Sequence, residues 1–259
     1  MPDKNNIRIL QFENLLTYNE IIHFSTTRVG GNSSGILQGF NLGYTVGDNP
    51  QDVTKNIDIL GDALNLNESK IVFPKQTHSA NVGIVKSDQE IFPDTDALIT
   101  NIPGICIGVR TADCVPILLY DPVQKAVAAI HSGWKSTIRE ISKHTIERMN
   151  EEFGTRPETL IAGIGPSIGP EVYEVGPEVI EQFQNHFSFD NYINPIKNSN
   201  KGLLNLWKIN HQILIDSGIP EKQIEIAEMC TYLNPDLFYS ARRDGVKTGR
   251  LATGIMLKK

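Results

Sequence analysis

The middle third of the chain holds six short apolar runs that are rich in β-branched residues and separated by turn residues. Runs of this length and composition are typical of strands. They cover residues 71–73, 82–85, 97–99, 105–109, 115–120 and 126–130. Stretches with helical spacing of apolar residues lie on both sides of this block. The pattern predicts a mixed α/β fold.

Helix signals flank the strands. Asn49 followed by Pro50 predicts a helix start, with Asn49 as N-cap and Pro50 in the first turn. The apolar face of that helix consists of Val53, Ile57, Leu60 and Leu64. Further helices are expected over 138–153, ending at Gly154, and over 177–186 and 204–217. Strands are expected between 12 and 24, and a polar loop over 191–202. With no repeat or linker, residues 1–259 are predicted to form one domain.

Composition narrows the class of protein. Lys plus Arg number 24 against 30 Asp plus Glu, a net charge of -6. This balance disfavours nucleic-acid binding but allows a local basic pocket for a small anion. Residues 102–120 are the most apolar stretch, yet Arg110 and Asp113 interrupt it, so membrane crossing is not expected. Three cysteines make no disulfide framework and the first residues lack a leader pattern, so we expect a cytoplasmic protein with reduced thiols.

Reactive side chains lie where predicted strands end, in residues 75–78, 110–114 and 131–135. The imidazoles of His78 and His131 and the thiolate of Cys114 could hold Zn²⁺ as three ligands and leave a fourth position open. Two alternative interpretations of these residues remain open. They could be hydrogen-bonded structural residues, or Cys114 and His131 could form a nucleophile pair. Cys106 and Cys230 have less polar neighbours and are expected to be core thiols.

Two further segments contain residues that could form a binding site, but their sequence patterns are less specific. Residues 163–169 are glycine-rich, but their spacing is not GxGxxG, so a tight turn is favoured over a dinucleotide site. Residues 238–245 place Arg242 and Arg243 beside an aromatic pair. Such a pair is either solvated surface or a planar recognition element for phosphate or carboxylate.

The motif segments occur in a characteristic order: residues 24–31, 41–43, 75–78, 111–114, 131–134 and 242–245. From about residue 24 to 255 the chain closely resembles the family named after the bacterial YfiH and YlmD proteins. Human FAMIN belongs to it, and its members are often labelled multicopper polyphenol oxidoreductase (laccase). The resemblance implies a single-domain, four-layer α/β/β/α sandwich similar to the cytotoxic necrotizing factor catalytic domain. It also implies one zinc ion per chain on His78, Cys114 and His131.

The resemblance implies an activity as well. Members act as purine nucleoside phosphorylases that cleave adenosine, inosine, guanosine or methylthioadenosine, with inorganic phosphate as co-substrate, and several also deaminate adenosine. The alternative is a peptidoglycan-editing amide hydrolase that removes L-serine from a muramic-acid precursor, through Cys114 or a zinc hydroxide. A third interpretation of the sequence is a binding module without enzymatic activity that a metal ion stabilises. A monomer and a small homo-oligomer are both compatible with the sequence.

The laccase label conflicts with the histidine count. A blue-copper centre with a trinuclear cluster takes about ten histidines, many in His-X-His pairs. This chain has 6 histidines, and no two are separated by one residue. We therefore expect no copper cluster.

Roles for individual residues follow from the two reactions. Asp113, Cys114 and His131 are expected to be catalytic, with Asp113 either transferring a proton during deamination or capping a turn. Phosphorolysis needs cations for phosphate and groups that hold the nucleoside. The candidates are Arg28, Lys135, Arg242 and Arg243 for phosphate, Gln76 and Asn41 for base or ribose, and Tyr173 for stacking.

Overall fold

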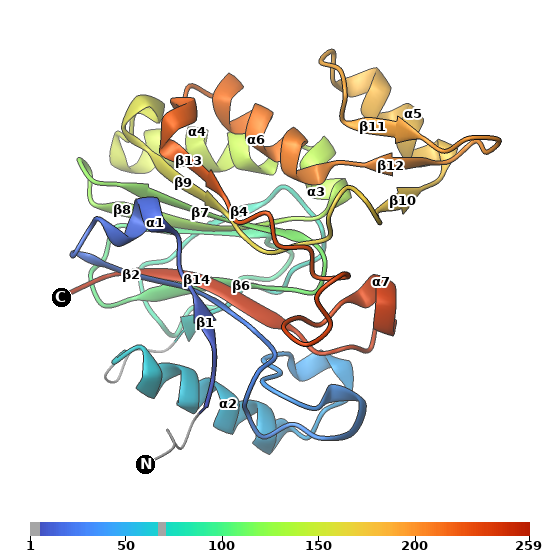
Figure 1. The fold of residues 1–259 in the computed structure, drawn as a ribbon. Helices are drawn as coiled ribbons and strands as arrows, with labels where there is room; N and C mark the ends of the chain where they lie inside the picture. The colour runs from blue at the N-terminus through green and yellow to red at the C-terminus, as the bar shows by residue number, and fades with distance from the viewer. Residues whose placement is uncertain (1–5, 67–70) are drawn as a thin grey trace.

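Two β-sheets pack face to face, and helices cover the outer face of each sheet (Figure 1). This architecture is seen in a computed structural model that describes residues 6–66 and 71–259. From bottom to top in Figure 1 the layers are α2, the first sheet, the second sheet, and the pair α4 and α6. The predicted α/β/β/α sandwich is confirmed.

The first sheet has β14 (Leu251–Leu257) near its middle, antiparallel to both of its neighbours. Its strand order is β1 (Ile9–Leu10), β2 (Ile21–Thr26), β14, β6 (Cys106–Thr111) and β3 (Ile71–Val72). Helix α2 (Pro50–Ala63) covers the outer face of this sheet, where Leu60 packs with Phe24 and Met256.

The second sheet is built around the hairpin of β7 (Val115–Asp121) and β8 (Ala126–Ser132). Its strand order is β13 (Ile224–Ile226), β9 (Ile161–Ile164), β7, β8, β5 (Ala97–Thr100) and β4 (Val82–Ile84). Successive side chains of a strand point to opposite faces. Ile117 and Leu119 therefore pack in the helix-side core, and Leu118 and Tyr120 pack between the sheets.

A small third sheet lies beside the sandwich, next to α5 (Pro177–His186). Its strands, in spatial order, are β10 (Glu174–Val175), β12 (Gly202–Leu204) and β11 (Ile193–Pro195). The prediction of a polar loop over 191–202 is therefore wrong at both ends. Ile193 pairs with Leu204, so the polar residues between the two strands form only the tip of a hairpin.

The predicted start of α2 is confirmed, because the Asn49 side chain accepts the Gln51 N–H at 3.0 Å and Pro50 opens the helix. The helix predicted over 138–153 corresponds to α4 (Ile141–Phe153), which starts three residues later than predicted, and Ile138 instead ends a separate short helix, α3 (Trp134–Ile138). They are divided at Glu140, whose φ of 51° is left-handed. As predicted, Gly154 ends α4, with a φ of 72°.

Several other helices differ from the predicted ones in their bounds or were not predicted. A short helix α1 (Glu13–Leu16) lies in the segment expected to hold only strands. The helix expected over 204–217 is α6 (Leu206–Asp216), and a short helix α7 (Ala241–Asp244) lies in the late arginine segment. Short 3₁₀ helices cover Gly35–Leu37, Tyr44–Val46, Pro157–Thr159 and Glu221–Gln223.

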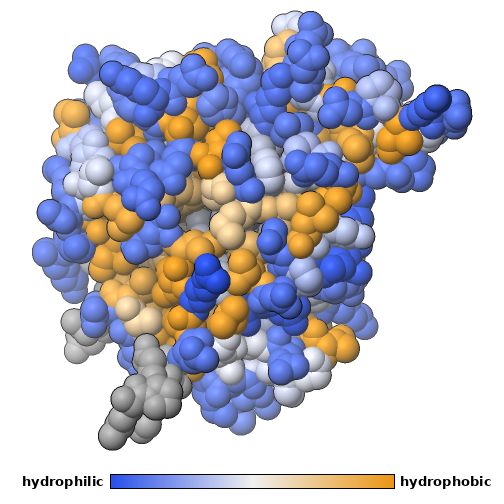
Figure 2. All heavy atoms as spheres, viewed as in Figure 1, coloured by the Kyte–Doolittle hydropathy of each residue, from blue (hydrophilic) through white to orange (hydrophobic). Residues whose placement is uncertain are grey.

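The surface is mostly hydrophilic on the face seen in Figure 2, where hydrophobic residues gather in a band over the edge that carries β1. Among the described helices, none combines the length and the apolar character needed to cross a bilayer. The first residues, on which the expectation of no leader rests, lie outside the described ranges. All three cysteines are free thiols, and Cys106 and Cys230 are buried as expected.

Candidate metal centre and its pocket

His78, Cys114 and His131 come together from three separate segments. His78 lies in the turn between β3 and β4, Cys114 lies between β6 and β7, and His131 lies on β8. Their ligand atoms all lie within 4.8 Å of one another, and Cys114 Sγ is 3.7 Å from His78 Nε2. The register of the β7–β8 hairpin, with Pro116 opposite His131, brings the thiol alongside the second imidazole.

Asp96, at the edge of β5, holds both histidines in place. Its carboxylate is fully buried and accepts a hydrogen bond from His131 Nδ1 at 2.7 Å. It also accepts the backbone N–H of His78 at 3.0 Å and of Ser79 at 2.7 Å. A carboxylate bound to one imidazole nitrogen fixes the tautomer and leaves the other nitrogen for a metal. The His131 Nε2 atom is therefore the free ligand atom.

Gly133 leaves the space that the three ligands need. A Cβ atom at this position would lie 2.6 Å from His78 Cδ2 and 3.0 Å from Cys114 Sγ. The backbone there is extended, with φ of −73°, so glycine is required by the close approach and not by the dihedral angles. Two imidazoles and one thiolate are ligands that suit zinc, and three ligands leave an open coordination position. The residues fit a catalytic zinc ion.

The charges of the three ligands are strongly coupled. Burial raises the pKa of the Cys114 thiol, but the facing His131 and His78 outweigh burial and hold that pKa below its ordinary value. Burial lowers the pKa of His131, but the Cys114 thiolate and the Asp96 carboxylate outweigh it and raise that pKa. The Cys114 thiol is thus prepared as a thiolate, which is the form that binds a metal.

A pocket of about 560 Å³ opens onto this centre and is lined by Cys114, His78 and His131 themselves. Among the described residues that line it, none is acidic. Its other walls combine aromatic rings with cations: Tyr44, Phe73, Phe92, Lys75, Arg110 and Arg250. A space of this size and lining suits an aromatic ligand with an anionic group.

Of the seven residues expected to bind substrate, only Gln76 lines the pocket. Its side-chain amide is paired with the backbone of Arg110, accepting the N–H at 2.8 Å and donating to the carbonyl at 2.7 Å. Asn41 is fully buried outside the lining, where it donates to Asp48 and accepts the backbone N–H of Arg250 at 2.8 Å. These contacts place both amides as supports for pocket arginines.

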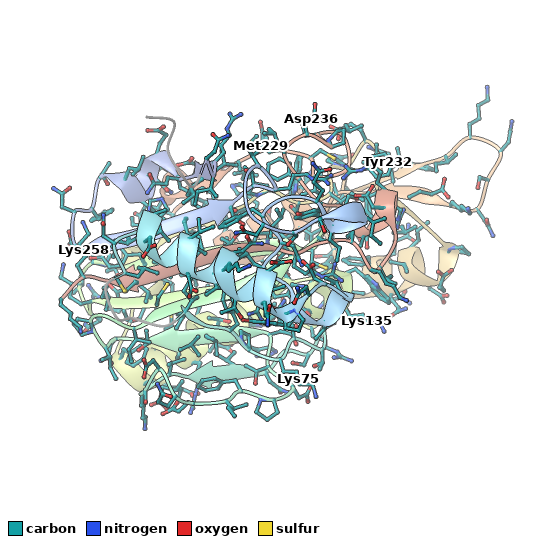
Figure 3. The ribbon with its side chains drawn as sticks, turned by 90° about the horizontal axis from the view of Figure 1, so that it is seen from below. Lys75, Lys135, Met229, Tyr232, Asp236 and Lys258 are labelled. Carbon is teal, nitrogen blue, oxygen red and sulfur yellow. The ribbon has the colours of Figure 1, made fainter. Side chains whose placement is uncertain are left out.

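All four cations expected to bind phosphate lie outside the pocket lining. Three of them, Arg28, Lys135 and Arg243, make separate contacts. Arg28 donates to the carbonyl oxygens of Pro235 and Gln38 and stacks on Tyr239. Lys135 is exposed beside the Trp134 ring. Arg243 donates to the carbonyl oxygens of Thr231, Tyr232 and Phe238. In Figure 3 the segment of Tyr232 lies at the edge opposite Lys75.

Arg242, Tyr173 and Asp113 form a second group outside the pocket lining. The Arg242 guanidinium lies 5.1 Å from the Tyr173 ring and donates to the Glu174 carbonyl. Asp113 accepts hydrogen bonds from the Arg242 N–H at 2.7 Å and from the Ser240 and Thr231 hydroxyls. Its φ of 91° places it in a tight turn. These contacts are those of a carboxylate that fixes a turn, and its role in proton transfer stays a prediction.

Three residues of the site were missed by sequence reasoning: Asp96, Arg110 and Arg250. Arg110 left a signal, because it is a single cation within the apolar run over 105–109 and 115–120. It also opens the reactive segment 110–114, but the sequence gives it no role of its own. Asp96 directly precedes a buried strand, and Arg250 directly precedes β14, whose existence the sequence pattern did not predict.

The fold and the site together define a class: an α/β/β/α sandwich with a three-residue His-Cys-His candidate metal site beside a cationic, aromatic pocket. The chain belongs to the family described as multi-copper polyphenol oxidoreductase laccase, whose model matches residues 22–258. Among the described residues, one group of His, Cys and acidic side chains has metal-site geometry, and it offers three ligands. A four-copper centre needs more than three times that number.

Relatives carry names of nucleoside enzymes. A protein of Bacteroides thetaiotaomicron named purine nucleoside phosphorylase is 40% identical over 97% of each chain. A protein of an unknown prokaryotic organism named adenosine deaminase RL5 is 35% identical over 91% of this chain and 93% of its own. The crystal structure of the Bacillus licheniformis hypothetical protein YfiH superposes with a TM-score of 0.89 at 32% identity, covering 98% of this chain and 100% of that one.

Proposed function

We propose that this protein is a zinc-dependent purine nucleoside phosphorylase that cleaves adenosine and related purine nucleosides with inorganic phosphate. The observation that carries the proposal is the His78–Cys114–His131 group, which opens onto a pocket with aromatic and cationic walls. A nucleoside supplies the aromatic partner and phosphate supplies the anion. Relatives named purine nucleoside phosphorylase, similar over nearly their whole length, support the same reaction.

The reaction exchanges one bond at the sugar. The bond from ribose C1′ to purine N9 breaks, and a phosphate oxygen bonds to C1′, giving ribose 1-phosphate. The electron pair of the broken bond leaves with N9, and a proton taken up by the purine completes the free base. The site must therefore hold phosphate beside C1′ and stabilise the negative charge that develops on the departing purine.

The chain's own residues divide these tasks. His78, Cys114 and His131 would hold the zinc ion, which supplies Lewis-acid charge when bound. Asp96 orients His131 and His78, so the ligand set is in position before substrate arrives. The rings of Tyr44, Phe73 and Phe92 line the pocket and offer flat apolar surfaces for a purine. The cations of the pocket wall face the phosphate.

Deamination of adenosine is a second activity for the same pocket, favoured by the relative named adenosine deaminase RL5. Water adds at C6 of the base and ammonia leaves, giving inosine. This reaction consumes no phosphate. The two activities therefore separate in a single assay, because only phosphorolysis depends on added phosphate.

The proposal is tested by identifying the products that the zinc-loaded protein forms from adenosine, with and without inorganic phosphate. When phosphate is present we expect free purine base, which is adenine plus hypoxanthine from any inosine formed, and ribose 1-phosphate in equal amounts; when phosphate is absent we expect neither. Cys114→Ala should abolish both products, whereas Cys230→Ala, which changes a buried thiol outside the pocket lining, should retain them. Zinc-loaded protein that releases no purine, or Cys114→Ala that retains full activity, would overturn the proposal.

A further inference from the structure

Among the described residues that line the pocket, Arg110 alone has a buried side-chain polar atom without a hydrogen-bond partner. Its Nε atom is buried, and no described residue accepts a hydrogen bond from it. The rest of the guanidinium likewise has no hydrogen bond or ion pair within the described part of the chain. A buried charge without an acceptor is costly, so such groups in proteins are normally paired. The other two guanidinium nitrogens are not among the buried atoms, and Arg110 lines the pocket, so a ligand there can supply the missing acceptor.

The Arg110 side chain is nevertheless held firmly. Its guanidinium lies 3.9 Å from the centre of the Phe73 ring and 5.8 Å from that of Tyr44. The backbone N–H and the carbonyl oxygen of Arg110 are both hydrogen-bonded to the side-chain amide of Gln76. Burial lowers the pKa of Arg110 to about 10, so the group remains a cation at neutral pH. Stacking on aromatic rings fixes the plane of the guanidinium and leaves its N–H edge for an acceptor.

Arg250, the second guanidinium of the pocket, is already satisfied. It donates to the carbonyl oxygens of Thr248, Gly249 and Val246. Lys75 is exposed at the pocket and brings a third positive charge. A chain with a net charge of -6 thus concentrates three cations, and no acidic side chain among the described lining residues, around one cavity. The positive potential of these three cations favours the binding of an oxyanion.

We infer that Arg110 binds the inorganic phosphate co-substrate, donating a pair of hydrogen bonds from its stacked guanidinium, with Lys75 and Arg250 adding long-range attraction. The inference rests on the proposed function and assigns its phosphate subsite to residues other than those expected from the sequence. A planar guanidinium matches two phosphate oxygens at once, which an ammonium group does not.

The test compares Arg110→Met, Arg110→Lys and the control Arg148→Met, which removes a partly exposed arginine of α4, outside the pocket lining, that pairs with Glu151 and Glu152. For Arg110→Met we expect the KM for phosphate to rise at least about tenfold, with the KM for adenosine changed less than about twofold. Arg110→Lys should recover part of the loss, and Arg148→Met should match the wild type. Adenosine deamination, which needs no phosphate, should persist in Arg110→Met.

A second readout does not depend on turnover. Inorganic phosphate should raise the Tm of the zinc-loaded wild type and of Arg148→Met, but not that of Arg110→Met. If the wild type releases no purine while this difference persists, the phosphorylase proposal fails and the anion site stands. Equal phosphate stabilisation of wild type and Arg110→Met, or a rise confined to the KM for adenosine, would overturn the inference. So would stabilisation by adenosine monophosphate without any by inorganic phosphate, because the site would then bind a phosphate ester.

Discussion

At the scale of single residues, the metal centre depends on a carboxylate that touches no substrate. Asp96 accepts hydrogen bonds from His131 Nδ1 and from the backbone N–H groups of Thr77, His78 and Ser79. One buried side chain therefore positions two ligands that lie more than fifty residues apart in the sequence. The neighbouring charges hold the pKa of Asp96 below its ordinary range despite burial, so it is an anion throughout the physiological pH range.

Replacing this carboxylate should loosen the metal without removing a ligand. We predict that Asp96→Asn lowers zinc affinity by about 10- to 100-fold, because the uncharged amide holds His131 less firmly. The matched control is Asp58→Asn, at an exposed position on α2. Competition with a chromophoric chelator measures both affinities. Wild-type zinc affinity in Asp96→Asn would show that the carboxylate does not position the ligand.

The three ligands could be proposed from the sequence because they sit in motif segments at strand ends. The residues that complete the site could not. Asp96, Arg110 and Arg250 act through contacts with partners far away along the chain, such as the Arg110–Gln76 pairing over 34 positions. Conversely, Asn41 and Arg243 resembled binding groups by residue type, but the fold uses their donors and acceptors internally.

At the scale of secondary structure, the junction from β8 to α3 shapes the metal centre. His131 is the last but one residue of β8, and Gly133 is the N-cap residue of α3. The chain passes so close to His78 and Cys114 that no side chain fits at position 133. The strand, the glycine and the helix start therefore act as one unit that sets the distance between ligands.

A methyl group at this junction should displace the ligands while leaving the fold intact. We predict that Gly133→Ala reduces zinc content to a small fraction of one ion per chain, because its Cβ would overlap His78 and Cys114. Gly61→Ala is the control, since a Cβ at that helical position meets no atom within 4 Å. It should keep full zinc content and gain up to about 1 kcal/mol in stability. Metal analysis and circular dichroism check both variants, and a zinc-replete Gly133→Ala would contradict the steric account.

The sequence pattern found most strands of the second sheet but missed the central strand of the first. The segment Leu251–Leu257 contains Gly254 and has little β-branched character, so it lacks the usual strand signal. The glycine is explained by packing, because a Cβ there would lie 2.7 Å from the Phe24 ring and 2.8 Å from the Ile107 carbonyl oxygen. Close tertiary packing therefore overrides local propensity in this strand.

At the scale of the whole molecule, stability depends on burial between the two sheets and under the helices, and this burial includes ionisable groups. His23 on β2 is 2% exposed, and its Nε2 accepts the Phe12 N–H at 2.9 Å. Burial lowers its pKa from 6.5 to about 4, and Nε2 can accept the Phe12 N–H only while it carries no proton. The folded protein therefore resists a proton that the unfolded chain binds below pH 6.5, so stability falls as the pH decreases from 6.5 through 4.

The contribution of His23 can be isolated by substitution. A shift of this size corresponds to about 3 kcal/mol lost between neutral pH and pH 4. We predict that metal-free His23→Gln loses about 2 to 3 kcal/mol less than metal-free wild type over this range, measured by urea unfolding. The exposed His144→Gln on α4 should lose as much as the wild type. An identical pH dependence in His23→Gln and wild type would contradict a neutral buried imidazole.

The whole molecule is, on this account, a rigid frame that gathers one metal ion and one anion around a purine nucleoside. Both sheets contribute, because β6 of the first sheet carries Arg110 and β8 of the second carries His131. Arg110 and His131 line the same pocket, so the proposed metal and phosphate sites share one cavity but belong to different layers of the sandwich.

The most direct test of this account is a zinc titration of the metal-free protein, with phosphate-dependent adenine release from adenosine as the readout. We predict that the rate rises linearly with added zinc and reaches its plateau at one equivalent per chain. Gly133→Ala should show little rise over the same range. Adenine release that is already complete in the metal-free protein, or that is unaffected by zinc, would contradict the central claim.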